Sequence, residues 1–252
     1  MIKIIIISKD ENSNSIQYIL DSFQKNEIFL ISPKADITKY SAKNLIKIND
    51  NNILDFNKLK EKLDLERFGW YYQQFLKYQS VLTLDGEEFL IIDGDTIIDK
   101  SLAKSNTLFR TDKSTVEGYS NLYKELFPEH TLNGKSFITN QMVFKKAYLK
   151  EIIDDIENDN SNSWIEKVTE LVKNNKNFMF SEYQVYAEYI LNKGYDIDVK
   201  QTSIFRRMDL IHDSIENALM KYNILAYENQ HKTGYLRILR AKLYYLFGKS
   251  IG

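Results

Sequence analysis

The chain has 252 residues, of which 43% are hydrophobic and 13% aromatic, and its formal net charge at pH 7 is −1. This length and apolar content are enough for one large hydrophobic core. The sequence has no cysteine, which excludes disulfides and thiolate zinc sites, and three histidines. Because the net charge is close to zero, no overall field attracts nucleic acid, and we expect no nucleic-acid partner.

Predicted strands and helices alternate in the first part of the chain. The β-branched run 2–7 is typical of a strand buried on both faces, and residues 15–25 form a predicted amphipathic helix. Further strands are predicted at 27–32 and 44–49, and residues 65–79 place aromatic side chains at helical spacing. This order predicts an open, mostly parallel α/β sheet flanked by helices. Ligands of such sheets bind at the carboxyl ends of the strands.

The second part of the chain has a different pattern. Its predicted elements are a strand at 137–144, helices at 148–158, 164–174 and 181–192, an extended segment at 195–206 and a short strand at 223–228. No internal repeat is visible. We expect one mixed α/β domain over residues 1–231, followed by a basic segment at 232–252.

Two acids follow the apolar run 89–92. Asp93 and Asp95, separated by Gly94, would lie at the carboxyl end of a buried strand. Hard divalent cations prefer oxygen ligands, and a Mg²⁺ or Mn²⁺ ion held by these acids can bind substrate phosphates. Asp-Gly is also a common turn dipeptide, so the tripeptide alone is equally compatible with a simple turn.

The segment 67–77 combines a glycine with polar side chains in a predicted helix. Gly69 inside a helix costs about 1 kcal/mol relative to alanine, so either the helix begins there or another group approaches its backbone. Gln73, Gln74 and Lys77 lie one turn apart, and with Arg67 they are candidates for contacts with a nucleotide. The alternative is a helix with an aromatic core face and a solvated polar face.

Together these segments resemble bacterial polysaccharide glycosyltransferases of the GT-A type, which serve capsule and lipopolysaccharide synthesis. The resemblance is carried by Arg-x-Gly-Trp-x-x-Gln-Gln at 67–74, Asp-x-Asp at 93–95 and Ser-Glu-Tyr at 181–183, and the segment 137–144 fits the same group. It extends from residue 2 to about residue 231. It implies a GT-A-like, Rossmann-like mixed sheet.

The resemblance also implies a ligand for each part of the site. A nucleotide-diphosphate sugar, expected to be a UDP-sugar, would lie over the first strands, with Mn²⁺ or Mg²⁺ as the cofactor. Asp95 would bind the metal, and Asp93 would bind the metal or the ribose. The expected nucleotide and donor contacts are Ser8, Lys9, Asp10, Arg67, Gln73, Gln74, Asp93, Asn140 and Gln141; the last two would touch the donor sugar or the acceptor.

Inverting members of this group place a carboxylate base at the start of a later helix, and Glu182 matches that position. The alternative is that Ser181 caps the helix and Glu182 favours its first turn. Glu188, on the same helix, is the less favoured base. A late histidine often completes the metal shell, and we favour His231 over His212.

Residues 232–249 carry five lysines and arginines among apolar side chains, and no acid. They predict a basic amphipathic C-terminal helix that lies on an anionic membrane surface or packs on the domain. The apolar run 2–7 is too short to span a membrane. We therefore expect a cytoplasmic protein, peripheral at the inner face of the cell membrane.

The resemblance implies a metal-dependent hexosyltransferase-like enzyme. It would move a sugar from the nucleotide donor to a hydroxyl of a surface polysaccharide or lipid-linked glycan, with inversion. One alternative is a nucleotidyltransferase of sugar activation, which usually needs a glycine-rich phosphate loop that residues 8–14 lack. The other is a non-catalytic module of a polysaccharide assembly complex.

Overall fold

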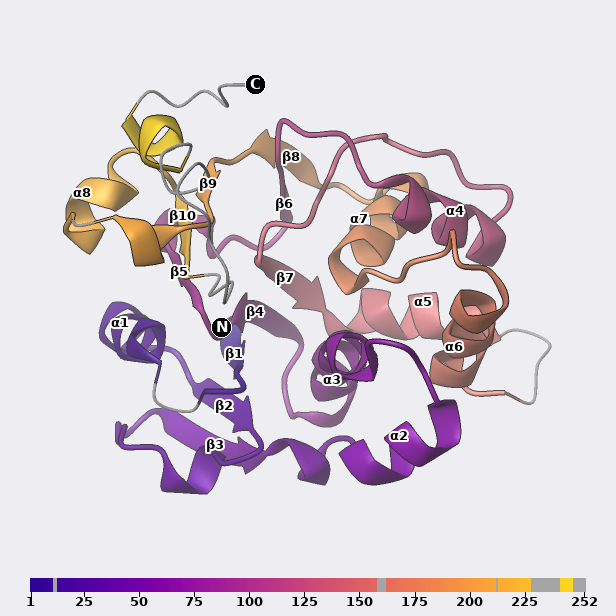
Figure 1. Cartoon of the computed structure of the whole chain (residues 1–252), viewed down its shortest axis with the longest axis horizontal. Coiled ribbons are helices and arrows are strands. Elements are labelled where there is room, and N and C mark those ends of the chain that lie inside the picture. The colour runs from indigo at the N-terminus through magenta and orange to yellow at the C-terminus, as the bar shows by residue number, and fades with distance from the viewer. Residues whose placement is uncertain (11–12, 158–161, 212, 228–240, 247–252) are drawn as a thin grey trace.

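The structure is a computed structural model that describes residues 1–10, 13–157, 162–211, 213–227 and 241–246. A five-stranded sheet forms its centre (Figure 1). The strand order is β3-β2-β1-β4-β7. These strands are β1 (Lys3–Ile7), β2 (Ile28–Ser32), β3 (Leu45–Asn49), β4 (Glu88–Asp93) and β7 (Gln141–Lys145). The first four run parallel, and β7 is antiparallel to β4. The mostly parallel α/β sheet predicted from the sequence is confirmed.

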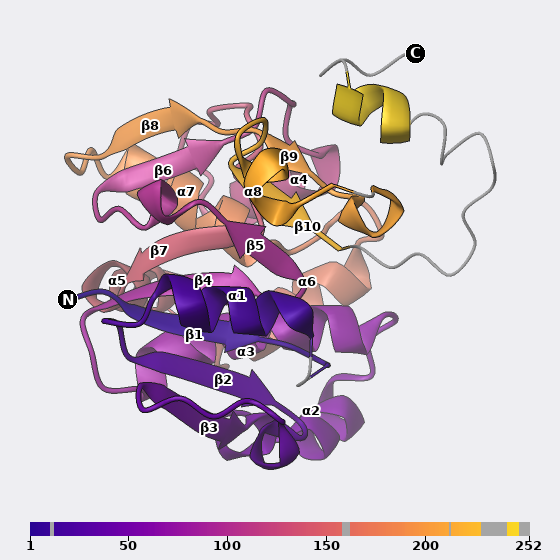
Figure 2. The same cartoon turned by 90° about the vertical axis from the view of Figure 1, so that its left-hand side faces the viewer.

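The two faces of β1 belong to different hydrophobic cores, because successive side chains of a strand point to opposite faces. Ile4 and Ile6 pack in the core that includes helix α1 (Asn14–Ser22). Ile5 and Ile7 pack in a larger core that includes helix α3 (Phe68–Thr83). Figure 2 shows α1 in front of the sheet. A strand that is covered on both faces has no polar side, which explains the unbroken apolar run.

Several helices pack around the larger core. The remaining helices are α2 (Phe56–Leu63), α4 (Glu117–Leu126), α5 (Lys146–Glu157), α6 (Trp164–Asn174), α7 (Glu182–Asn192) and α8 (Ile215–Leu219). Helices α4 to α7 contribute buried side chains to the same core as α3. The helices predicted at 148–158, 164–174 and 181–192 are confirmed as α5, α6 and α7.

Two small sheets complete the described structure. Strands β5 (Thr96–Ile98), β10 (Ile224–Ala226) and β9 (Ile204–Phe205) form one, in the order β5-β10-β9. Strands β6 (Thr107–Arg110) and β8 (Asp198–Gln201) form the other. In both sheets, segments 90 or more residues apart in the chain pair with each other, as Thr107 does with Asp198 and Leu225 with Ile97. Strands β8 and β9 lie within the predicted extended segment 195–206.

The predicted strand at 137–144 is too long at its start. The strand begins at Gln141, because Asn140 adopts a left-handed conformation with φ +59° that ends extended pairing. Asn140 therefore precedes the strand, and does not interrupt it. Helices α2, α4 and α8 and strands β5 and β6 add to the predicted order. Helix α2 carries Phe56, Leu59 and Leu63 at helical spacing, and of its residues only Leu63 is buried.

The C-terminal prediction falls mostly outside the described residues. Residues 241–246 are helical, whereas 228–240, 247–252 and the proposed boundary between 231 and 232 lie outside the described part. The division into two segments stays a prediction. Within the described ranges, no helix is both long and apolar enough to cross a membrane.

Candidate active site

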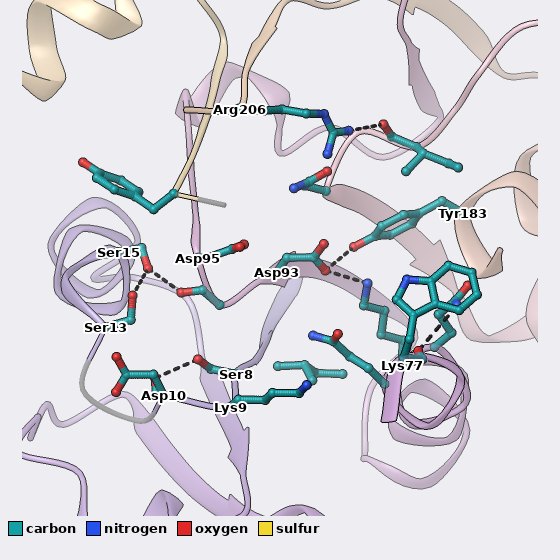
Figure 3. A pocket seen from close by; sticks show the side chains of 18 of the residues that line it. Ser8, Lys9, Asp10, Ser13, Ser15, Lys77, Asp93, Asp95, Tyr183 and Arg206 are labelled. Carbon is teal, nitrogen blue, oxygen red and sulfur yellow. Dashed lines mark hydrogen bonds and ion pairs between the residues drawn. The ribbon is translucent and has the colours of Figure 1, made fainter. Parts of the chain in front are cut away.

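A large cavity lies at the carboxyl ends of β1 and β4 (Figure 3). Its volume is about 1110 Å³, which is large for a small-molecule site. The segment after β1, helix α3, the turn after β4 and the start of α7 all contribute to its lining. Because β1 and β4 are parallel neighbours, both of their carboxyl ends reach the same edge of the sheet. This is where an open α/β sheet binds its ligands.

The turn Asp93-Gly94-Asp95 is held against the end of β1. The Gly94 amide donates to the Ile7 carbonyl at 2.8 Å, and the Ser15 hydroxyl donates to the Gly94 carbonyl. A Cβ atom on Gly94 would lie 2.8 Å from the Cα atom of Ser8, so only glycine fits without movement. Residues 93–95 therefore form a turn, as the Asp-Gly dipeptide alone also predicted. The carboxylates of Asp93 and Asp95 both line the cavity.

Lys77 joins two carboxylates on the cavity wall. Its Nζ atom lies 2.5 Å from Asp93 Oδ1 and 2.6 Å from Glu182 Oε1. The Tyr183 hydroxyl donates to the same Asp93 oxygen at 3.0 Å, and Lys77 Nζ lies 4.3 Å from the centre of the Tyr183 ring. Lys77 and Glu182 are 4% and 3% exposed. One buried cation thus neutralises part of the charge of two acids.

The elements that carry this cluster are fixed independently of it. Helix α7 begins at Glu182, and the Ser181 side chain accepts a hydrogen bond from the Gln184 amide as an N-cap. The Tyr78 hydroxyl donates to the Glu182 carbonyl at 2.7 Å and ties α3 to α7. The capping interpretation of Ser181 is confirmed, and the same cap places the Glu182 carboxylate at the cavity.

Burial and charge shift the protonation of the cluster. Burial raises the pKa of the Glu182 carboxyl above its ordinary value, and the Lys77 ammonium opposes that rise. Burial alone lowers the pKa of Lys77, but Asp93 and Glu182 outweigh it and keep the ammonium charged. Burial and the nearby Asp93 carboxylate raise the pKa of the Tyr183 hydroxyl, which stays a hydrogen-bond donor. Strongly shifted groups in a cleft are typical of functional sites.

The structure brings most of the predicted site residues together. The cavity is lined by Ser8, Lys9, Asp10, Gln73, Gln74, Asp93, Asp95, Asn140 and Glu182. Arg67 and Gln141 are not among its lining residues. Arg67 precedes α3 with its guanidinium 4.9 Å from the centre of the Trp70 ring, and Gln141 is 1% exposed in β7. His212 and His231 lie outside the described residues.

The structure also shows the surroundings of Gly69, of the less favoured base Glu188 and of His130. Helix α3 begins at Phe68, so Gly69 lies in its first turn, and a Cβ atom there would meet nothing within 4 Å. Glu188 accepts from the Asn133 amide at 3.0 Å and does not line the cavity. His130, the remaining histidine of the chain, packs against Phe127 with ring centres 5.2 Å apart.

Other residues of the cavity carried different amounts of sequence signal. Lys77 lies one helical turn after Gln73, and this spacing already made it a candidate; the structure places it in the cavity lining. Tyr183 is part of the Ser-Glu-Tyr segment. Arg206 donates to the Ile138 carbonyl at 3.1 Å, and nothing in the sequence around it indicates that position.

The two turn acids fit a metal that arrives with a phosphate ligand. Among the residues that the structure describes, no group of three or more acids and histidines could hold a metal ion by itself. Mg²⁺ usually takes only one or two protein carboxylates and completes its shell with substrate phosphates and water. The contacts of Lys77 and Tyr183 both go to Asp93 Oδ1. Asp93 Oδ1 is therefore already engaged by two donors of the protein itself.

No protein-family model and no curated protein matches the sequence. Among solved structures, the galactosyltransferase LgtC in complex with donor and acceptor sugar analogs matches with a TM-score of 0.50 and 13% identity, over 96% of this chain and 93% of that chain. The chain has the GT-A fold. In this GT-A fold, the cavity and both turn acids lie at the carboxyl edge of the central sheet.

Two further matches have lower TM-scores and add nothing to that conclusion. An active-site mutant of LgtC has a TM-score of 0.42 at 14% identity, over 95% of each chain. The glycosyltransferase GlyE of Streptococcus pneumoniae TIGR4 has a TM-score of 0.41 at 12% identity, over 98% of this chain and 61% of that chain. At these identities, likeness of structure establishes the fold alone.

Proposed function

We propose that this chain is a metal-dependent glycosyltransferase that moves a sugar from a nucleotide-diphosphate donor to a hydroxyl group. The observation that carries the proposal is the pair Asp93 and Asp95 at the carboxyl edge of a GT-A sheet, beside a cavity of about 1110 Å³. A cavity of this size suits a donor and an acceptor together. The match to LgtC, with a TM-score of 0.50, supports the proposal because LgtC is a galactosyltransferase.

The donor would extend from the end of β1 towards the turn after β4. Ser8, Lys9 and Asp10 would border the nucleotide, which we expect to be uridine diphosphate, and Gln73 and Gln74 add amide groups to the same wall. When bound by Asp95, with Asp93 beside it, Mn²⁺ or Mg²⁺ supplies Lewis-acid neutralisation of the leaving diphosphate. His231 is proposed as a further ligand, and Asn140 lines the cavity where the sugar would lie.

Glu182 is the proposed general base. The acceptor oxygen forms a bond to the anomeric carbon while the bond from that carbon to the diphosphate oxygen breaks, and Glu182 takes the hydroxyl proton. A base works best when its pKa lies near the operating pH, and burial moves the pKa of Glu182 in that direction. Lys77 keeps the carboxylate oriented through the 2.6 Å contact. Attack from the face opposite the leaving group inverts the anomeric centre.

The proposed acceptor and cellular location rest on the resemblance of the sequence to bacterial polysaccharide glycosyltransferases. We propose a growing capsule or lipopolysaccharide chain, or a lipid-linked glycan, as the acceptor. The basic segment 232–249 would bring the protein to an anionic membrane surface.

The central test is donor binding and turnover. Calorimetry with UDP in the presence and absence of Mn²⁺, followed by a screen of nucleotide sugars for metal-dependent hydrolysis, should show metal-dependent binding and release of nucleotide. No binding of any nucleoside diphosphate would exclude the proposal and favour a non-catalytic module.

The variant Glu182→Gln tests whether Glu182 is the general base. In Glu182→Gln the amide oxygen still accepts from Lys77, so we expect donor affinity to be kept while turnover falls by about 10²–10⁴-fold. Glu125→Gln, on the exposed surface of α4, is the control and should behave like the unmodified protein. Unchanged turnover in Glu182→Gln would remove it from the catalytic role.

A further inference from the structure

Helix α7 buries the side chains of Gln184 and Glu188, which have no part in the proposed reaction. They are 2% and 1% exposed, and neither is among the lining residues of the cavity. Together with Asn192, at the end of the helix, they follow one another at intervals of four residues, so the three side chains project from one helix face. Buried polar side chains have hydrogen-bond partners as a rule, and here the partners belong to one short segment of the chain.

This segment is residues 131–137, which run alongside α7. The Phe137 amide donates to Gln184 Oε1 at 3.0 Å, and Gln184 Nε2 donates to the Lys135 carbonyl at 2.9 Å. Gln184 Nε2 also donates to Glu188 Oε1 at 3.0 Å. One glutamine side chain thus bonds to the backbone of the segment at two points and to the next polar side chain on the helix.

The other two side chains bond to the backbone in the same way. The Asn133 amide donates to Glu188 Oε2 at 3.0 Å. The Thr131 amide donates to Asn192 Oδ1, and Asn192 Nδ2 donates to the Thr131 carbonyl, both at 2.8 Å. Every second residue of the 131–137 segment is therefore hydrogen-bonded to a side chain of α7.

The repeat distances of helix and extended chain explain this match. Four residues of an α-helix rise about 6.0 Å, and two residues of extended chain rise about 6.6 Å. The opposite edge of the segment pairs with other backbone groups: the Thr115 amide donates to the Gly134 carbonyl at 3.2 Å, and the Ser136 amide donates to the Lys113 carbonyl at 3.0 Å. One face of α7 thus takes the place of a neighbouring strand.

The 131–137 segment leads directly into the wall of the cavity. Ile138 and Asn140 follow it, and both line the cavity. The Arg206 guanidinium donates to the Ile138 carbonyl at 3.1 Å (Figure 3), and the Asp93 amide donates to the Asn140 carbonyl at 3.0 Å. Helix α7 begins at Glu182. The same helix therefore carries the proposed base and the side chains that hold this part of the wall.

We propose that Gln184, Glu188 and Asn192 are positioning residues, which fix the part of the cavity wall that faces the transferred sugar. They act through the backbone of the 131–137 segment and touch no substrate atom. This inference rests on the proposed function. The proposed nucleotide contacts come from the end of β1, from α3 and from the turn after β4. Loss of the contacts of α7 with the segment should therefore impair the reaction of the sugar and leave nucleotide binding intact.

Hydrogen exchange of the full chain tests whether α7 holds the segment. Glu188→Ala removes both acceptor oxygens, whereas Glu188→Gln keeps one. The Asn133 amide should exchange about tenfold faster or more in Glu188→Ala, and by a smaller factor in Glu188→Gln, because a protecting hydrogen bond is lost. The Ser136 amide, on the opposite edge, is the internal reference. Ile190→Val, in the core on the same helix, is the matched control and should leave both amides unchanged.

Enzyme assays separate positioning from a general loss of stability. In Glu188→Ala, UDP with Mn²⁺ should bind as it does to the unmodified protein. Hydrolysis of the UDP-sugar that the screen finds to be cleaved fastest should fall by about tenfold or more, because a displacement of about 1 Å can cost about 10²-fold in rate. Glu188→Gln should recover part of that rate, and Ile190→Val should keep all of it.

Three results would overturn this inference and leave the proposed function standing. They are unchanged exchange of the Asn133 amide in Glu188→Ala, unchanged hydrolysis in that variant, and an equal loss of UDP binding and hydrolysis. If the unmodified protein hydrolyses no nucleotide sugar, the proposed function fails and the role in sugar transfer fails with it. The exchange of the Asn133 amide then still decides whether α7 holds the 131–137 segment.

Discussion

The Nζ atom of Lys77 lies 2.6 Å from Oε1 of Glu182, and this contact joins helix α3 to the first residue of helix α7. The same ammonium lies 2.5 Å from Asp93 Oδ1. A single buried cation thus links the acid proposed as the base to an acid at the metal end of the cavity. Changes in Lys77 should therefore affect both stability and function.

Lys77→Met should be strongly destabilising. It leaves Glu182 and Asp93 without their counter-ion, and breaking a buried pair in this way costs about 3–5 kcal/mol. Urea unfolding measures the change. Lys62→Met is the comparison, because Lys62 pairs with Glu166 at the surface and such pairs contribute about 0–1 kcal/mol. Equal stability of the two variants would show that the buried contact is unimportant.

The rate of transfer should depend on pH through Glu182. Burial raises the pKa of this carboxyl, so the ionised base appears only at a pH above the ordinary range for glutamate. The turnover number should therefore increase as pH rises through that raised pKa and decrease below it. Rates measured from about pH 5 to 8 would show the acidic limb, and Glu182→Gln should lack it. A flat profile in the unmodified protein would argue against this base.

Asp95→Asn should weaken nucleotide binding only when metal is present. The amide loses the charge that a hard cation prefers, so affinity for UDP with Mn²⁺ should fall by about tenfold or more, whereas affinity in EDTA should not change. Asp21→Asn, at an exposed position of α1, is the control. Equal affinity of Asp95→Asn and its control in Mn²⁺ would remove Asp95 from the metal site.

Tyr183→Phe tests how Asp93 is oriented. The variant removes the 3.0 Å hydrogen bond to Asp93 Oδ1 and keeps the ring that packs near Lys77. Loss of such a partner typically lowers metal affinity by about 10–100-fold. Titration of nucleotide binding against Mn²⁺ concentration measures this metal affinity. If Asp93 contacts only the ribose, the dependence of nucleotide binding on Mn²⁺ concentration will not change in the variant, and only the affinity for the nucleotide will.

Two glycines should respond in opposite ways to alanine. A Cβ atom on Gly94 would lie 2.8 Å from Ser8 Cα, so Gly94→Ala must displace the turn or the end of β1 and should cost about 1–3 kcal/mol. Gly69→Ala meets nothing within 4 Å in a helix and should stabilise by up to about 1 kcal/mol. Thermal unfolding compares them. Matching effects would mean that Gly94 is not packed against Ser8.

Local patterns in the sequence were enough for the central elements. The apolar run of β1 is continuous because both faces of that strand are covered, and the aromatic spacing of α3 follows from one helix face packing on the sheet. Such periodicity is a property of consecutive residues, so it can be read without the fold. The position of Asp93 and Asp95 at the end of a strand was predictable for the same reason.

Tertiary structure decided the relationships between distant residues. Lys77 and Glu182 are 105 residues apart, and only the packing of α3 against α7 makes them partners. The sequence by itself determined where the strands of the central sheet lie and which acids follow them. The three-dimensional packing decided which charges those acids meet, since contacts between distant segments leave no periodic pattern in the chain.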